Sequence, residues 1–132
     1  MTVSIHDVRE AVAAAVKAAT GWQTYAYSPR SVQLPCGFAG PHEADTLDTG
    51  GGLDLTLHYW VAVDPTSDSK QRTLDEALVA VANEIDSDPD LGIDDGGVHA
   101  SFGGWSDYGD LEIGSTRMWA ARIAVNVLIA GE

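Results

Sequence analysis

The sequence predicts an α+β fold, in which a mostly antiparallel sheet packs against two helices in a single domain that spans residues 1–132. Three observations predict it. Two segments repeat apolar residues at helical spacing, other segments alternate apolar with polar residues as strands do, and the elements follow in the order helix, strands, helix, strands. Because that order contains no β-α-β series, hairpins are expected to connect most of the strands.

The first expected helix covers residues 5–19. Ser4 stands at its N-cap position, Asp7 lies in its first turn and Gly21 follows its end, and these are the residue types that helix termini favour. One face of the helix is expected to be buried, because apolar residues recur along it at helical spacing. These residues are Ile5, Val8, Val12, Ala15, Val16 and Ala19.

The segment from residue 22 to residue 52 has no clear period. Pro29, Pro35 and Pro41 interrupt short extended pieces, so the segment is expected to be loop and edge strand. Residues 32–39 are its best strand candidate, and residues 49–52 are expected to end it as a glycine-rich turn.

Residues 53–64 show the clearest strand pattern in the chain. Side chains alternate between the two faces of a strand, so a period of two separates a buried face from a polar one. One face carries Leu53, Leu55, Leu57, Tyr59, Val61 and Val63, and the other carries Asp54, Thr56, His58, Trp60 and Ala62.

A second helix is expected to follow, with apolar residues at helical spacing from Leu74 to Ile85 and an end at residues 86–90. Two capping pairs compete for its start, Asp68 with Gln71 and Thr73 with Glu76. Three further strands are expected at residues 98–105, 111–114 and 117–129.

The composition is strongly acidic, with 20 Asp and Glu against 7 Lys and Arg, a formal charge of -13. Wrapping of nucleic acid is excluded on this ground, because such binding depends on Lys and Arg that displace counterions from phosphates. The single cysteine, Cys36, cannot form an internal disulfide. No apolar run approaches the roughly 20 residues that a membrane-spanning helix needs, so no membrane is expected among the partners.

Carboxylates gather after the second expected helix, where they resemble the start of a calcium-binding loop. Leu91 stands where that loop needs a glycine and Gly97 where it needs a bidentate glutamate, so neither a metal nor a cofactor is expected. No Lys or Arg occurs from Thr73 to Thr116, which confines much of the acidity to one region. The candidate contact loop comprises Glu84, Asp86, Asp88, Asp90, Asp94 and Asp95.

The sequence shows no pattern typical of a catalytic site. His6, His42, His58 and His99 are scattered rather than paired at helical spacing, and no serine lies in a nucleophile-elbow motif. We therefore expect a protein that is not an enzyme.

Aromatic residues outside the core stripes suggest contacts with a partner. Large aromatic side chains are enriched at protein interfaces, where they bury much area at a small cost in entropy. Two interpretations of Trp60 stay open: it contacts a partner, or it is covered within the domain. The candidate interface residues are Trp22, Tyr25, Tyr27, Trp60, Trp105 and Tyr108.

Several short motifs follow one another over nearly the whole chain. They are the tyrosine- and proline-containing pieces at 25–29 and 32–35, a strand with an acidic turn at 57–68, a helix start with Gln71, Leu74 and Asp75, a loop at 90–92, a turn at 108–109 and a Trp-Ala-Ala strand at 119–121. In their order and spacing the chain resembles the small tail-terminator and neck proteins of long-tailed bacteriophages, in particular those of phages that infect actinobacteria.

The resemblance implies a structural protein of the virion that assembles in the host cytoplasm. Tail terminators form a ring, expected to be a hexamer, on the last ring of the tail tube protein, stop polymerisation of the tube and present a surface to the head-tail connector or head-closure protein. Genomic DNA would only pass through the lumen, and acidic residues around that lumen would repel its phosphates.

Two alternatives to the tail terminator stay open. The protein could instead be a head-closure or connector protein of the neck. From a different class, it could be a calcium- or ligand-binding bacterial domain that uses the acidic loop at residues 84–95.

Overall fold

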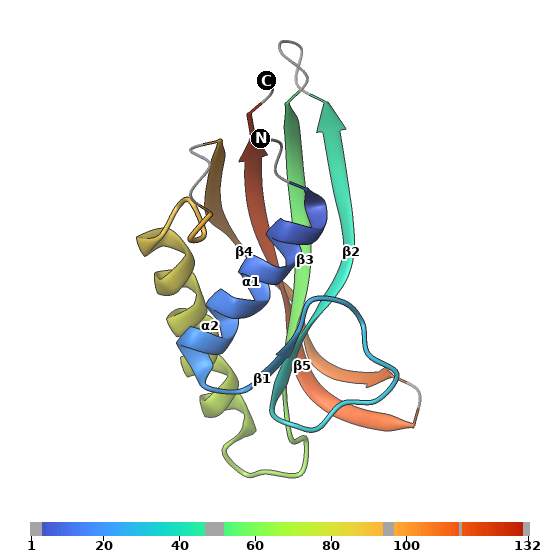
Figure 1. Cartoon of the computed structure of the whole chain (residues 1–132). Helices are drawn as coiled ribbons and strands as arrows, with labels where there is room; N and C mark the ends of the chain where they lie inside the picture. The colour runs from blue at the N-terminus through green and yellow to red at the C-terminus, as the bar shows by residue number, and fades with distance from the viewer. Residues whose placement is uncertain (1–3, 47–51, 94–96, 114, 131–132) are drawn as a thin grey trace.

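The computed structural model of the protein describes residues 4–46, 52–93, 97–113 and 115–130. Two helices lie side by side on one face of a five-stranded sheet, which confirms the α+β class (Figure 1). None of the described helices is long and apolar enough to cross a membrane. The elements are α1 (Ile5–Thr20), β1 (Gln23–Tyr25), β2 (Cys36–Thr46), β3 (Leu53–Val63), α2 (Lys70–Ser87), β4 (Val98–Ile113) and β5 (Thr116–Ile129).

The strands lie in the order β1-β2-β3-β5-β4. Only β1 and β2 are parallel, and the other three pairs are antiparallel. The last strand in the sequence therefore lies inside the sheet, between β3 and β4. As a result, β3 and β4 run in the same direction, and α2 connects them by crossing over β5.

Helix α1 forms where the sequence predicts it, and its caps are the predicted ones. The Ser4 hydroxyl accepts the Asp7 N–H at 3.1 Å, and the Asp7 carboxylate accepts the Ser4 N–H at 3.2 Å. Gly21 ends the helix with a φ of 74°, where its N–H donates to the Lys17 carbonyl at 2.7 Å. Each cap satisfies backbone groups that the helix itself leaves without a partner.

The main core lies between the helices and one face of the sheet. The predicted alternation in β3 is confirmed, because Leu55, Leu57, Tyr59 and Val61 are all fully buried there. On β5 the same face carries Ala121, Ile123, Val125 and Val127, and on α2 the buried residues are Leu74, Ala77, Leu78, Val81 and Ile85.

A second, smaller apolar cluster lies on the opposite face of the sheet. It consists of buried residues from three neighbouring strands, and Val32 and Leu34 from the segment between β1 and β2 pack against it. The segment between β1 and β2 therefore covers one end of this face of the sheet. The buried members are Cys36, Phe38, Ala62, Met118 and Ala120.

Cys36 provides a test of this second cluster. Its thiol is fully buried, and desolvation raises the pKa of Cys36 to about 11, so at pH 8 the group is a protonated thiol. We expect an aromatic disulfide reagent to modify the native protein at least roughly tenfold more slowly than the protein unfolded in guanidinium chloride. Equal rates in the two states would show that the cluster does not shield Cys36.

The structure differs from the sequence prediction in the segment before β3. The sequence predicts a strand at residues 32–39, whereas β2 covers Cys36–Thr46 and lies inside the sheet, with the three-residue β1 at the edge. Pro41 lies at an irregularity between Ala39 and His42, a place where a strand tolerates a residue without an N–H. The proline therefore marks a bulge and not the end of the strand.

The predicted separate strand at residues 111–114 is also wrong. Strand β4 continues from Val98 to Ile113 through two irregularities, between Phe102 and Trp105 and between Ser106 and Gly109. Positive φ values of 93° at Gly104 and 149° at Gly109 allow the strand to continue through them.

The start of α2 matches neither of the predicted capping pairs. The helix begins at Lys70 after Ser69, whose side chain makes no capping hydrogen bond. Thr73 lies inside the first turn, where its N–H donates to the Ser69 carbonyl at 2.9 Å.

Candidate interaction surfaces

Three of the six predicted interface residues are partly covered within the domain. Trp22 packs against the main core, and Tyr25 and Trp60 pack against the second cluster. The Trp60 ring stacks on Phe38 with 6.5 Å between the ring centroids. A contact of these three residues with a partner stays a prediction, although part of each side chain is already buried within the domain.

The other three predicted interface residues are much more exposed, with 50% of the Tyr27 surface, 48% of Trp105 and 37% of Tyr108 accessible to solvent. Tyr27 follows β1 at one edge of the sheet, whereas Trp105 and Tyr108 belong to β4 at the other edge. The exposed aromatics therefore form two surfaces on opposite sides of the domain.

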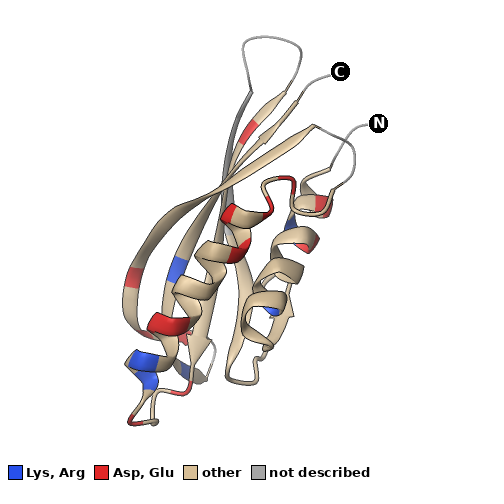
Figure 2. Cartoon of the chain, turned by 90° about the vertical axis from the view of Figure 1, so that its left-hand side faces the viewer, with Lys and Arg blue, Asp and Glu red and all other residues tan. Residues whose placement is uncertain are grey.

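The first surface lies where α2 runs beside β4 (Figure 2). Near the start of α2, the Tyr108 hydroxyl donates to the Asp75 carboxylate at 2.8 Å and is also 3.3 Å from the Gln71 carbonyl oxygen. Near its end, the Asp86 carboxylate accepts the Phe102 N–H at 3.1 Å. These hydrogen bonds hold β4 against one side of the helix.

Val79 lies on the same side of α2, four residues after Asp75 and seven before Asp86, and it is 53% exposed. On β4, the Trp105 ring lies 6.2 Å from the Phe102 ring. We call Val79, Trp105 and Tyr108, together with Asp75 and Asp86, the α2–β4 seam. Val79 is not among the predicted interface residues; the signal in the sequence is an apolar residue outside the buried stripe of α2.

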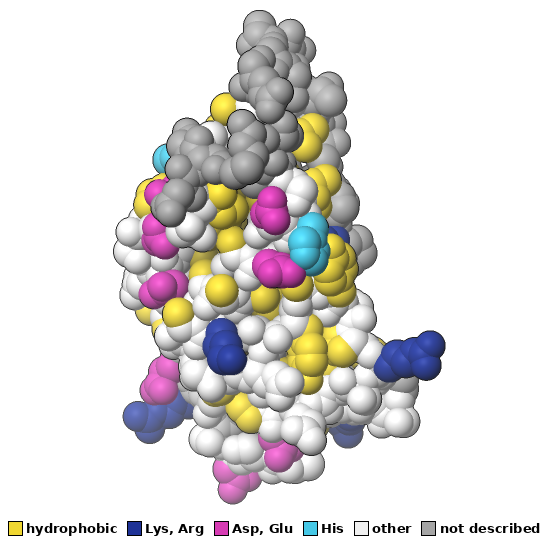
Figure 3. All heavy atoms as spheres, viewed as in Figure 1, with side chains coloured by type: hydrophobic (Ala, Val, Ile, Leu, Met, Phe, Trp, Pro, Cys, Tyr) yellow, Lys and Arg dark blue, Asp and Glu magenta, His cyan; other side chains and the backbone are white. Residues whose placement is uncertain are grey.

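The α2–β4 seam is acidic. Within the described residues, neither Asp75 nor Asp86 is paired with a cationic side chain, and no Lys or Arg occurs between Thr73 and Thr116. Figure 3 shows acidic side chains along the α2 side of the helical face. An acidic surface with exposed aromatic side chains therefore runs along this edge of the domain.

The second surface surrounds Tyr27. Its hydroxyl is 2.8 Å from Nδ1 of His6, the two rings stack at 5.8 Å, and the Arg9 guanidinium lies 5.0 Å from the Tyr27 ring centroid. Arg9 is only 8% exposed, and its Nη1 donates to the carbonyls of Gly40 at 3.3 Å and Ala26 at 3.5 Å. The Tyr27 ring is therefore held in place while half of it faces solvent.

Two exposed cationic side chains belong to the elements on this side of the domain. Lys17 lies eleven residues after His6 on α1, which places both on one side of the helix, and Arg30 follows Tyr27 by three residues. Both Lys17 and Arg30 are exposed. We call Tyr27, Lys17 and Arg30 the tyrosine edge. Exposed Asp7 and Glu10 lie on the same part of α1, where the Glu10 carboxylate is 2.6 Å from Nε2 of His6, so the surface around Tyr27 carries charges of both signs.

The acidic contact loop lies at the end of α2 and in the turn that follows. Glu84, Asp86, Asp88 and Asp90 are within the structure, whereas the predicted Asp94 and Asp95 lie outside the described residues. The Asp90 carboxylate accepts the Gly92 N–H at 3.0 Å. In the described part of the chain, no three His, Cys, Asp or Glu side chains are placed to hold a metal ion.

Asp88 tests the electrostatics of this loop. Its hydrogen bond with Asp90 raises the pKa of Asp88. Asp88 caps the C-terminal end of α2, where the negative end of the helix dipole also disfavours a carboxylate. A raised folded-state pKa means that the favourable contribution of protonated Asp88 is complete below its unfolded pKa and is lost as the pH rises through the folded value. Asp88→Asn, which stays neutral, should therefore raise the melting temperature slightly at pH 7.

The gain from Asp88→Asn should disappear near pH 3, where Asp88 of the parent protein is protonated. Differential scanning calorimetry at both pH values measures it. Asp68→Asn is the matched control, because Asp68 precedes the positive end of α2 and its loss should not raise the melting temperature. A gain of equal size at pH 3 and pH 7 would contradict the electrostatic explanation.

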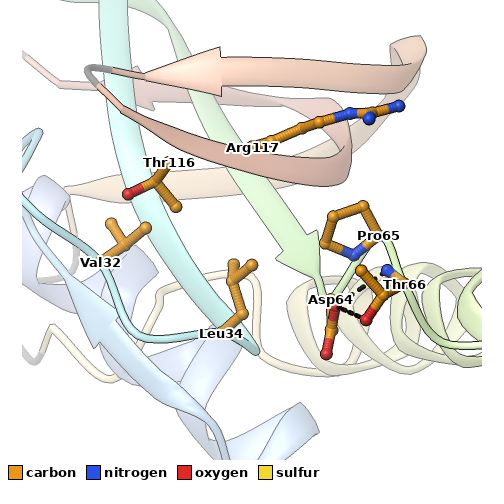
Figure 4. Close-up of a pocket in the computed structure, with 7 residues that line it drawn as sticks. All are labelled: Val32, Leu34, Asp64, Pro65, Thr66, Thr116 and Arg117. Carbon is orange, nitrogen blue, oxygen red and sulfur yellow. Dashed lines mark hydrogen bonds between the residues drawn. The ribbon is translucent and has the colours of Figure 1, made fainter.

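A notch of about 460 Å³ lies between the segment before β2, the turn after β3 and the start of β5 (Figure 4). The Asp64 carboxylate accepts the N–H and the hydroxyl of Thr66 at 2.9 and 2.7 Å, which lowers the pKa of Asp64 and commits it to the turn. Arg117 pairs with Asp110 at 3.3 Å. The lining residues are Val32, Leu34, Asp64, Pro65, Thr66, Thr116 and Arg117.

No protein-family model and no curated protein matches the chain.

Proposed function

We propose that the protein is a structural virion protein that caps the tail tube of a bacteriophage as a ring, with six copies as the expected number. The observation that carries this proposal is the pair of exposed aromatic surfaces, the α2–β4 seam and the tyrosine edge, on opposite sides of one small domain. The order of short motifs along the chain, which resembles that of tail terminators, supports this proposal.

Two different surfaces on one chain favour a cyclic assembly. When a surface of one copy binds a different surface of the next, the contact is heterologous, and a rotation that closes gives a ring. The two open ends of such a ring would then contact the tail tube protein on one side and the head-tail connector or head-closure protein on the other.

The charge of the chain suits a ring around DNA. Six copies would carry a formal charge of -78, since each contributes -13. Glu84, Asp88 and Asp90 lie in the loop at 84–90 outside the α2–β4 seam, and if they face the lumen they would repel DNA phosphates and let the genome pass without binding.

Native mass spectrometry and electron microscopy of the purified protein test the ring directly. A closed ring, formed alone or on tail tubes, is the expected result. A monomer under both conditions would contradict the proposal, and a monomer whose melting temperature rises with calcium would instead favour the ligand-binding alternative.

The role within the phage is tested by removing the gene from the phage that encodes it. A tail terminator is needed to stop polymerisation of the tube, so its loss should produce overlong tails. Tails of normal length together with heads that leak DNA would instead indicate the head-closure protein.

A further inference from the structure

We infer that the protein binds an extended, cationic segment of another protein at one edge of its sheet, where the segment adds to β2 as a further strand. The inference goes beyond the ring proposed above and does not depend on it. We call the backbone of His42–Thr46, on the side away from β3, the open edge.

Strand β2 has a neighbour on both sides along only part of its length. β3 pairs with it as far as Thr46, whereas β1 pairs only with Cys36–Phe38. No described strand lies beside the open edge (Figure 1). In an antiparallel sheet every second residue directs its N–H and C=O to the same side, so alternate residues of the open edge offer both groups to a new strand.

Between the end of β1 and Pro41, side chains satisfy the backbone of β2. The Ala39 carbonyl accepts the Ser28 hydroxyl at 2.8 Å, and the Gly40 carbonyl accepts Nη1 of Arg9 at 3.3 Å. Strand addition is therefore confined to the residues beyond Gly40.

The opposite edge of the sheet is protected. The N–H groups of Ala100 and Phe102 donate to the Pro89 carbonyl at 2.6 Å and to the Asp86 carboxylate at 3.1 Å. Farther along, two irregularities interrupt the regular row of backbone groups of β4. Such devices prevent unwanted pairing, so their presence at β4 marks the open edge of β2 as the place where a strand can add.

The charge at the open edge favours a cationic segment. No Lys or Arg occurs from Ser31 to Ser69, whereas β2 carries Glu43 and Asp45. The register places Asp45 directly opposite Asp54 of β3, and like charges in such a pair are destabilising. A cation on an added strand would offset this repulsion.

The charges of α1 bear on the same edge, because α1 packs against β2. Arg9, in the first half of the helix, contacts β2 just before the open edge begins, whereas Lys17 lies in the last turn. The exposed carboxylates of the first half are Asp7 and Glu10, and Glu10 is 2.6 Å from His6. The exposed Lys17 therefore lies at the end of α1 away from the open edge.

A second copy of this chain does not suit the open edge. Antiparallel pairing of two open edges would bring Glu43 and Asp45 of one copy against the same acidic residues of the other. Within the described residues, β3 and β5 are paired on both sides and β4 is protected. A different protein is therefore the expected source of the segment, and in the proposed virion the tail tube protein and the connector are such partners.

The register also predicts the pattern of the segment. Alternate residues of β2 pair with the apolar and the polar residues of β3. A strand beside β2 would continue this alternation, so apolar residues should alternate in it with Lys or Arg. The pairs on the apolar side are His42 with Leu57, Ala44 with Leu55 and Thr46 with Leu53.

A short peptide with neutral ends, in which lysine and valine alternate, is the probe. Amide hydrogen exchange of residues 42–46, followed by NMR, is the readout. At a peptide concentration about ten times the dissociation constant, the amides that point away from β3 should exchange about tenfold more slowly. A peptide with glutamate in place of lysine should bind at least about tenfold more weakly.

Two N-methylated forms of the lysine–valine peptide separate strand addition from adhesion of a cationic peptide to an acidic protein. One form is methylated on the backbone nitrogens of its lysines, the other on those of its valines. Because alternate N–H groups of a strand point to the same neighbour, only one form should lose binding. Binding by both forms, or by neither, would overturn the inference.

Glu43→Lys with Asp45→Lys should weaken binding of the lysine–valine peptide at least about tenfold. Asp68→Lys with Glu76→Lys is the matched control, because it changes the net charge equally at exposed residues outside the sheet, and it should bind the peptide like the parent. Equal weakening in both would show that net charge alone attracts the peptide. Circular dichroism checks folding, and Asp45→Lys alone replaces a double variant that misfolds.

The outcomes separate this inference from the proposed function. A protein that forms rings but does not bind the peptide overturns the inference and leaves the ring standing, and a monomer that binds it does the reverse. If the amides of residues 42–46 become protected without peptide as the protein concentration rises, a second copy occupies the open edge and the inference fails.

Discussion

Tyr59→Ala is expected to lower the free energy of unfolding by about 3–5 kcal/mol, the usual cost of truncating a large buried aromatic side chain. Tyr59 is fully buried on the helix-facing side of β3. The packing around it is tight, since a Cβ atom added at Gly37 would lie 2.7 Å from Cε1 of the Tyr59 ring and 3.2 Å from Cγ1 of Val16. Alanine would leave a cavity between the sheet and α1.

Guanidinium chloride denaturation followed by circular dichroism measures this effect. Tyr59→Phe is the control, because it keeps the ring and should cost less than about 1.5 kcal/mol. A loss below about 1 kcal/mol for Tyr59→Ala would show that the surrounding residues collapse into the space, and that the core is less tightly packed than the structure indicates.

Arg9→Met is expected to cost about 2–4 kcal/mol, because it removes a buried cation and leaves the Gly40 carbonyl without its donor. It also removes the cation from the face of Tyr27. Methionine keeps most of the volume of the side chain, so the loss reports on hydrogen bonds and charge more than on packing. The segment between β1 and β2 should become less well anchored to α1.

Urea denaturation measures the stability of Arg9→Met, and the NMR signals of the Tyr27 ring report on local order. Lys17→Met is the matched control, since Lys17 is exposed on the same helix and its replacement should change stability by less than about 0.5 kcal/mol. Equal effects of the two substitutions would contradict a special role for Arg9.

Elements with local signals could be predicted from the sequence. Ser4, Asp7 and Gly21 mark the ends of α1 within the helix itself, and the alternation from Leu53 to Val63 requires one buried face whatever the neighbouring strands are. The extent of β2 could not be predicted, because it depends on pairing with β3, a partner distant in the chain. Pro41 obscured that pairing, since a bulge and a strand end look alike in the sequence.

The candidate surfaces show the same limit. Trp105 and Tyr108 could be selected by residue type alone, but their place beside Asp75 depends on the packing of α2 against β4. The exposure of Val79 could not be predicted, because it depends on which strand lies beside α2. The burial of Arg9 could not be predicted either, because no local pattern distinguishes a buried arginine that binds Gly40 from a solvated one on the surface of a helix.

The central position of β5 has a consequence for synthesis of the protein. During translation, β3 and β4 leave the ribosome before the strand that joins them, so β3 can pair only with β2 and β4 has no neighbouring strand until residues 116–129 have emerged. Until then the apolar stripe of β3 lacks half of its sheet and is open to wrong partners. We therefore expect the sheet to be completed only after residues 116–129 have left the ribosome.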